Sequence, residues 1–145
     1  MKRLVVAPDL IRRAIAKAQR TGKPHNAARV TFVKSALAAL TEQLRRGGSA
    51  IDDDDLRMLR EDLRTSYDVR VLLNTAWLPL TPQKLIQDLY ARPAWLAELT
   101  PCWTDAQRAA LRRDRSEPFT IADVPLLDEA AELLGDFPAR PDPAA

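Results

Sequence analysis

The period of the apolar residues limits what this chain can fold into more than any other feature. Over residues 9–20, apolar side chains recur with the 3.6-residue spacing of an amphipathic helix, and most of the basic residues fall on the other side. Ala, Leu and Arg dominate the composition and β-branched residues are few, which favours helices throughout. The sequence therefore predicts an all-α fold. The apolar stripe of this first segment is Leu10, Ile11, Ala14, Ile15 and Ala18.

Start and stop signals divide the chain into successive helices. Gly22 and Pro24 end the first one, and Asn26 is a suitable N-cap for the second because its side-chain oxygen accepts a free backbone N–H. Gly47 is expected to end the second helix with a positive φ. The predicted buried stripe of this helix is Phe32, Val33, Ala36, Leu37, Leu40 and Leu44.

Two later helix starts also carry capping chemistry. Thr81 precedes Pro82, a residue that favours the first helical position, and Thr104 and Gln107 have the spacing of a capping box. Residues 68–77 permit either a short helix capped by its first residue or a strand, because valines and leucines alternate there. We expect about six or seven helices in all.

The chain is long enough for an ordinary domain. Its 145 residues need no metal or disulfide to build a core. We predict a compact helical bundle over residues 1–136 and a flexible tail over residues 137–145, where three of nine residues are proline. No apolar run reaches the roughly 18–20 residues of a membrane span. The single cysteine, Cys102, excludes an internal disulfide and is typical of a cytoplasmic protein.

Charge is distributed unevenly although the net charge is only +2. Residues 1–46 hold eleven Lys and Arg against two acids, a net charge of +9, and the remainder carries −7. Such asymmetry is typical of a face that contacts phosphates, but the two parts can also neutralise each other or lie on solvated helix faces. The candidate nucleic-acid-binding residues are Arg12, Arg13, Lys17, Arg20, Lys23 and Arg29.

Four consecutive aspartates, Asp52, Asp53, Asp54 and Asp55, form an acidic run before the next apolar helix pattern. Negative charge at a helix start is favoured by the helix dipole, by about 0.3–1 kcal/mol for one well-placed group. Capping needs fewer than four acids, because neighbouring carboxylates repel each other. The acidic run is therefore either a solvated helix start or a candidate partner-binding site, with Mg²⁺ as a further possible ligand.

The stretch "LLDEA", residues 126–130, resembles the acidic box of an ATPase. Such a box ends a buried strand and needs a glycine-rich phosphate loop, and none of the four glycines begins one. Pro125 stands before the two leucines, and proline is poorly placed in a central strand. We interpret the stretch as a helix whose acids, Asp128 and Glu129, face solvent.

No other constellation points to catalysis. His25 is the only histidine and Cys102 the only thiol, and no local motif joins them as a nucleophilic pair. One histidine and one cysteine do not make a zinc set. Trp77, Trp95 and Trp103 are each expected to pack in the core, with an exposed aromatic binding spot as the alternative.

Three stretches carry a resemblance to a known family: "KPHNAARVTFV", "LNTAWLPLTPQKLIQDLY" and "FTIADVPLLDEAAELLG". They resemble an internal segment of HelD-type proteins, the UvrD-like superfamily-1 helicase relatives that act on bacterial RNA polymerase. The resemblance covers most of residues 5–135 and includes no catalytic motif. It implies a helical insertion that opens the polymerase clamp, with an acidic loop that reaches the polymerase channel.

The resemblance also implies what the chain lacks. In the family, the Walker A loop lies upstream and the Walker B strand "DEAQD" lies downstream of this segment. We therefore expect no ATPase activity, no catalytic or metal-binding residue and no cofactor. The resemblance predicts a fragment or truncated HelD-like protein that binds RNA polymerase, and the proline-rich tail in place of the strand favours a genuine short chain. The alternative is a nucleic-acid-binding module that uses residues 1–46.

Overall fold

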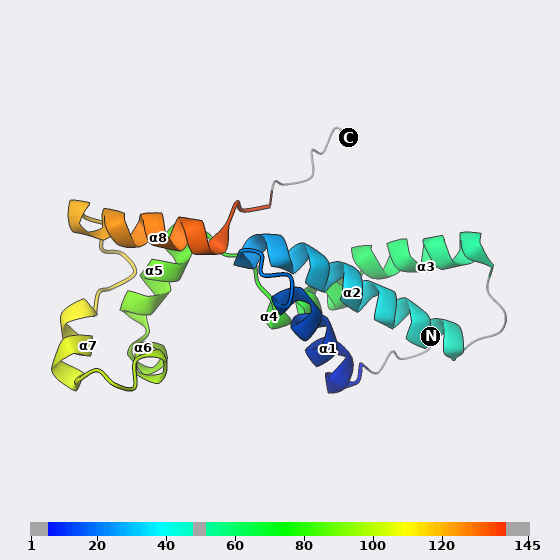
Figure 1. The fold of residues 1–145 in the computed structure, drawn as a ribbon, viewed down its shortest axis with the longest axis horizontal. Helices are drawn as coiled ribbons and strands as arrows, with labels where there is room; N and C mark the ends of the chain where they lie inside the picture. The colour runs from blue at the N-terminus through cyan, green and yellow to red at the C-terminus, as the bar shows by residue number, and fades with distance from the viewer. Residues whose placement is uncertain (1–5, 48–51, 139–145) are drawn as a thin grey trace. The chain divides into compact units, whose positions relative to one another are not determined.

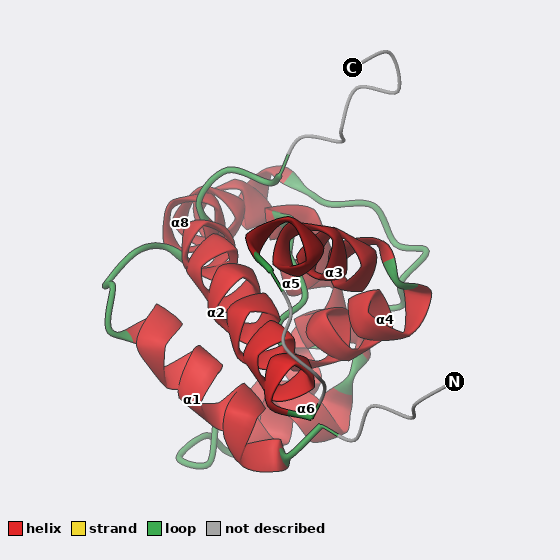
Figure 2. Cartoon of the chain, turned by 90° about the vertical axis from the view of Figure 1, so that its right-hand side faces the viewer, coloured by secondary structure: helices red, strands yellow, loops and turns green. Residues whose placement is uncertain are grey.

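The structure is a computed structural model that describes residues 6–47 and 52–138. Within these residues it contains helices and loops and no strand (Figure 2), which confirms the all-α prediction. The described residues form eight α-helices rather than about six or seven, and one of them lies in segment 68–77, for which the sequence left a strand open. Most of the predicted tail, residues 139–145, lies outside the described residues.

The chain divides into two compact units, Met1–Pro79 and Leu80–Ala145, which we call unit 1 and unit 2. The predicted helical domain over residues 1–136 spans both. Unit 1 contains α1 (Pro8–Gln19), α2 (His25–Arg46), α3 (Asp53–Thr65) and α4 (Tyr67–Ala76). Unit 2 contains α5 (Pro82–Ala91), α6 (Pro93–Leu99), α7 (Asp105–Leu111), the 3₁₀ turn η1 (Ile121–Asp123) and α8 (Val124–Leu134).

Unit 1 is built around α2, the longest described helix. Figure 1 shows α1 and α3 lying beside α2, and α3 packs in turn on α4. The predicted stripes of α1 and α2 face this core, although several of their larger side chains are only partly buried. The buried core residues of unit 1 are Ala14, Ala18, Ala28, Phe32, Ala36, Leu37, Leu40, Leu63, Val69 and Leu73.

Trp77 joins the end of α4 to the start of α2. Its ring stacks on Phe32 at 5.6 Å and on His25 at 5.3 Å between ring centroids. The indole Nε1 donates to the backbone oxygen of His25 at 3.1 Å. His25 Nε2 lies 2.7 Å from the oxygen of Leu78. Core packing of Trp77 is thus confirmed, and the only histidine has a structural role here.

Two capping predictions for α2 are wrong. The helix begins at His25 with Pro24 at the N-cap, so Asn26 lies inside the first turn, where it is 2% exposed. Gly47 ends α2 with a φ of −84°, because the last turn simply tightens and needs no left-handed residue. The positive φ values occur at Gly22, 68°, and at Gly135, 72°. Both glycines were predicted to stop a helix.

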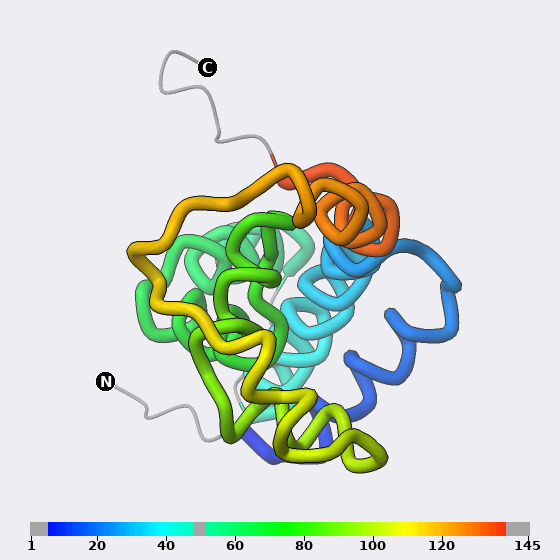
Figure 3. Tube along the Cα trace, turned by 90° about the vertical axis from the view of Figure 1, so that its left-hand side faces the viewer, coloured from blue at the N-terminus to red at the C-terminus, as the bar shows by residue number. Residues whose placement is uncertain are grey.

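Unit 2 packs α5 against α8, and the tube in Figure 3 shows these two helices running close together. Ile86 and Tyr90 of α5 meet Ala130 of α8 in a small buried cluster. The segment "LLDEA" is part of α8, which confirms the helix interpretation, and Asp128 and Glu129 are exposed.

Segment 68–77 also adopts the helical alternative, but Asp68 lies within α4 and Ser66 takes the N-cap position.

Candidate functional site

The acidic run forms the first turn of α3. Asp52 is the N-cap, and its Oδ1 accepts a hydrogen bond from the backbone nitrogen of Asp55 at 2.8 Å. All four aspartates are exposed, and none forms an ion pair with a basic side chain in the described parts of the chain. Capping therefore uses one carboxylate, and three more stand at the same helix end.

Among residues 6–47 and 52–138, no three His, Cys, Asp or Glu side chains come together as a metal site. The acidic run is included in that range. Its carboxylates follow one another around a helical turn, so they point in different directions.

The basic residues predicted on the first helix remain on the surface. Arg12, Arg13, Lys17, Arg20 and Lys23 are all exposed. Arg13 forms an ion pair with Asp9 at 3.2 Å, but both side chains are mostly in solvent, where such pairs contribute about 0–1 kcal/mol. The other four have no acidic partner among the described residues.

Arg29 is different, and the prediction that it contacts nucleic acid finds no support in its position. Its Nε donates to the backbone oxygen of Trp77 at 2.7 Å, and its Nη2 donates to Oδ1 of Asn74 at 2.5 Å. The side chain is partly buried, and this desolvation lowers the pKa of Arg29. Arg29 therefore ties α2 to the end of α4. The sequence alone hides this role, since both partners lie more than forty residues away.

A groove between α1 and α2 gathers cations from both helices. It has a volume of about 570 Å³, and Arg13 and Lys17 line it from α1 while Arg46 lines it from the last turn of α2. Arg46 was not predicted from the sequence. It lies near the start of α1 only because α2 runs antiparallel to α1. The other cation at this end, Arg45, binds Glu42 at 2.5 Å, and Arg46 binds the same carboxylate at 3.2 Å. These contacts, the Arg45 hydrogen bond foremost, lower the pKa of Glu42 to about 2.

Unit 2 contains a buried carboxylate that the sequence did not mark. Asp123 is 1% exposed, and its Oδ2 accepts from Arg113 Nη1 at 2.6 Å and from the backbone nitrogen of Thr120 at 2.7 Å. The hydroxyl of Tyr90 donates to Oδ1 at 2.9 Å. The Arg113 hydrogen bond, followed by the one from Thr120, holds the pKa of Asp123 well below its usual range. The cluster is fully hydrogen-bonded, which is typical of a structural network.

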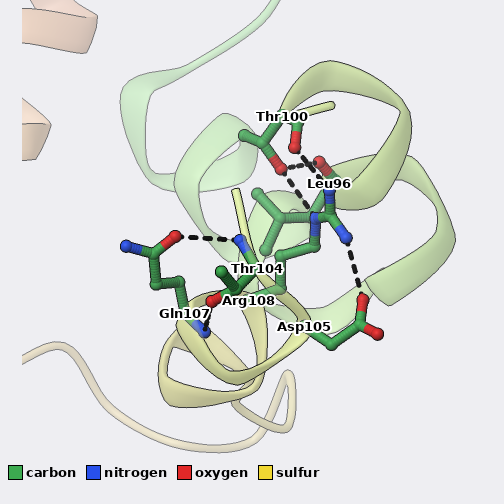
Figure 4. Close-up of polar contacts among 6 residues, drawn as sticks. All are labelled: Leu96, Thr100, Thr104, Asp105, Gln107 and Arg108. Atoms are coloured by element: carbon green, nitrogen blue, oxygen red, sulfur yellow. Dashed lines mark hydrogen bonds and ion pairs between the residues drawn. The ribbon is translucent and has the colours of Figure 1, made fainter. Parts of the chain in front are cut away.

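A second polar cluster holds α6 to α7 (Figure 4). Arg108 Nη2 donates to the oxygen of Thr100 at 2.6 Å, and Nη1 pairs with Asp105 at 3.0 Å. Thr104 and Gln107 form the predicted capping box, with both reciprocal hydrogen bonds present. This cluster fixes the turn between the two short helices.

The tryptophans of unit 2 are more accessible than the core prediction requires. Trp103 is 44% exposed, and Trp95 is partly buried under the guanidinium of Arg92, 5.3 Å from its ring centroid. Cys102 is exposed beside Trp103 in the sequence. His25 and Cys102 belong to different units.

No known family model matches this chain, and no curated protein matches it either. The resemblance to HelD-type proteins therefore stays a prediction. No helix in the described residues is both long enough and apolar enough to cross a membrane.

Proposed function

We propose that this chain is a helical binding module that contacts RNA polymerase through the acidic run, without ATPase activity of its own. The observation that carries the proposal is that Asp53, Asp54 and Asp55 are exposed at one helix end with no basic partner in the described chain. An enzyme that holds nucleic acid must present basic channel walls, and exposed carboxylates complement such walls.

The resemblance supplies the identity of the partner in this proposal. Two of the three stretches that carry it extend beyond single helices: residues 73–90 include the end of α4 and most of α5, and residues 119–135 include η1 and α8. The acidic run lies outside all three stretches. The charge argument therefore does not depend on the stretches that carry the resemblance, and by itself it favours any partner with a basic surface.

Replacing all four aspartates of the acidic run with asparagine tests the proposal. Asparagine caps a helix about as well as aspartate, so the fold should persist while four charges disappear. We expect the unaltered chain to bind RNA polymerase without ATP, on the order of micromolar affinity, and the fourfold variant to bind at least tenfold more weakly.

The matched control removes four charges from unit 2. Asp128→Asn, Glu129→Gln, Glu132→Gln and Asp136→Asn alter exposed residues of α8 and of the segment after it. This variant should bind polymerase as the unaltered chain does. An equal loss of polymerase affinity in both variants would show that net charge alone matters. Unchanged binding of the fourfold asparagine variant would show that the acidic run only begins a helix.

Nucleic-acid binding is the second candidate function, favoured by the exposed cations of α1. Arg12, Lys17, Arg20 and Lys23 have no acidic partner among the described residues, and Arg13 has only a solvent-exposed one. Each phosphate contact contributes about −0.9 to the log–log salt slope on duplex DNA, so five contacts give about −4.5 at most. A flat salt response, or no binding at low salt, would exclude this function.

A further inference from the structure

The groove between α1 and α2 has features beyond surface charge. Lys17 and Arg46 line it from opposite helices, 29 positions apart in the sequence, and Arg13 lies one helical turn before Lys17. Cations on both sides of a groove can contact one polyanion from two directions. A single helix face presents its charges from one direction only.

Small side chains make up much of the remaining lining. Ala14, Ser35, Ala38 and Ala39 contribute a methyl or hydroxymethyl group each, so a ligand can approach the helix backbones closely. Ser35 adds a hydroxyl that can donate to a phosphate oxygen. No aromatic residue lines the groove, so bases have no stacking platform there.

The groove itself carries three cations against two acids, and Asp9 pairs with Arg13 while Glu42 is shared by Arg45 and Arg46. The positive charge is larger over the whole hairpin that surrounds the groove. Residues 8–46 carry nine Lys and Arg against these two acids, a net charge of +7. Arg29 accounts for one of these charges and is turned to α4, which leaves a strongly positive hairpin around the groove.

We propose that this groove binds the phosphodiester backbone of a nucleic acid, with Arg13, Lys17 and Arg46 as the phosphate contacts and without reading the bases. The inference rests on the second candidate function and assigns it a site. An acidic helix is the other anionic polymer to consider. It would need apolar pockets for anchoring side chains, and the groove offers mainly alanine methyl groups.

Paired neutralising variants test the assignment. Lys17→Gln with Arg46→Gln removes one groove cation from each helix. Lys34→Gln with Arg60→Gln also removes two exposed cations of unit 1, but neither residue lines the groove or belongs to the candidate phosphate contacts. Binding is measured by fluorescence anisotropy with a labelled 16-base-pair duplex, a labelled dT strand and a mixed-sequence strand, over a series of salt concentrations.

The groove variant should bind the duplex at least tenfold more weakly at low salt, and its salt slope should be smaller by about 1.8, for two lost contacts. The control variant should keep its slope, and the two strands should bind within about twofold of each other.

Equal effects of the two variant pairs would contradict the assignment of the groove as the binding site, although nucleic-acid binding itself would stand. Absence of binding by the unaltered chain would overturn both. Binding of polyglutamate in place of nucleic acid would assign the groove to an acidic peptide, and a tenfold preference for one strand would contradict backbone recognition.

Discussion

Arg113 and Asp123 form the tightest ion pair of unit 2 that includes a buried group, with Nη1 2.6 Å from Oδ2 and the aspartate 1% exposed. The pair joins the segment after α7 to η1 at the start of α8. Arg113 also covers the ring of Tyr90, with its guanidinium carbon 4.6 Å from the ring centroid. Since Tyr90 belongs to α5, one carboxylate organises three separated segments of unit 2.

Asp123→Asn should lower the melting temperature of unit 2 at pH 7. The substitution keeps the shape but leaves the Arg113 guanidinium without its countercharge. The pKa of Asp123 is lower in the folded chain than in the unfolded chain. The ionised carboxylate therefore adds to the free energy of unfolding above the unfolded-state pKa of about 3.9, and this addition is lost as the pH falls toward the folded-state pKa. The difference between variant and unaltered chain should therefore shrink below about pH 4. Circular dichroism melts from pH 7 to pH 2 measure it, and a pH-independent difference would contradict the account.

Arg29→Ala should destabilise unit 1 by roughly 1.5–3 kcal/mol, because hydrogen bonds from a charged donor to Trp77 and Asn74 are lost. Arg12→Ala, which removes an exposed arginine without a described partner, should stay within about 0.5 kcal/mol. Urea unfolding followed by fluorescence reports the difference. If the two variants are equally stable, Arg29 is a surface residue and returns to the nucleic-acid candidates.

Thr104→Ala should weaken the start of α7 by about 0.5–2 kcal/mol, since Thr104 Oγ1 accepts from the backbone nitrogen of Gln107. Thr104→Ser keeps a hydroxyl and serves as the control. Faster amide hydrogen exchange in α7 of the alanine variant alone is the expected result. Equal exchange in all three proteins would mean that the Arg108 contacts hold this helix without its cap.

The purified chain should not hydrolyse ATP, because Asp128 and Glu129 lie on an exposed helix rather than at the end of a strand. A phosphate-release assay with Asp128→Asn as the comparison checks this. If ATP turnover is present and disappears in Asp128→Asn, the interpretation of residues 126–130 as a non-catalytic helix is wrong. Turnover that persists would reveal an ATP site elsewhere in the chain.

Local patterns were sufficient to predict most of the helices. The Thr81 and Thr104 caps and the glycine at 135 act within one turn, so their effects can be derived from neighbouring residues. The same reasoning failed at Asn26, because the helix begins at His25 with Pro24 at the N-cap, two residues before the predicted cap. It also underestimated the number of helices, since the alternation of valines and leucines in residues 68–77 was compatible with either a helix or a strand.

The candidate sites depend on contacts that are distant in sequence, and these were harder to predict. In the sequence, Arg29 has the features of a phosphate-binding residue, and only the fold brings its hydrogen-bond partners Asn74 and Trp77 beside it. Arg46 lines the groove only because α2 packs along α1. Asp123 was one acid among twenty. Its capping-box spacing from Thr120 is a local signal, but its burial depends on Arg113 and Tyr90, which lie 10 and 33 positions away.

Hydrogen–deuterium exchange of the chain, alone and with RNA polymerase, tests the central proposal most directly. If the acidic run binds the polymerase, amides in the first turns of α3 should exchange more slowly in the complex, and this protection should be absent from the fourfold asparagine variant. The amides of α5 to α8 should exchange alike in both states. Unchanged exchange at the start of α3 in the presence of saturating polymerase would contradict the proposed function.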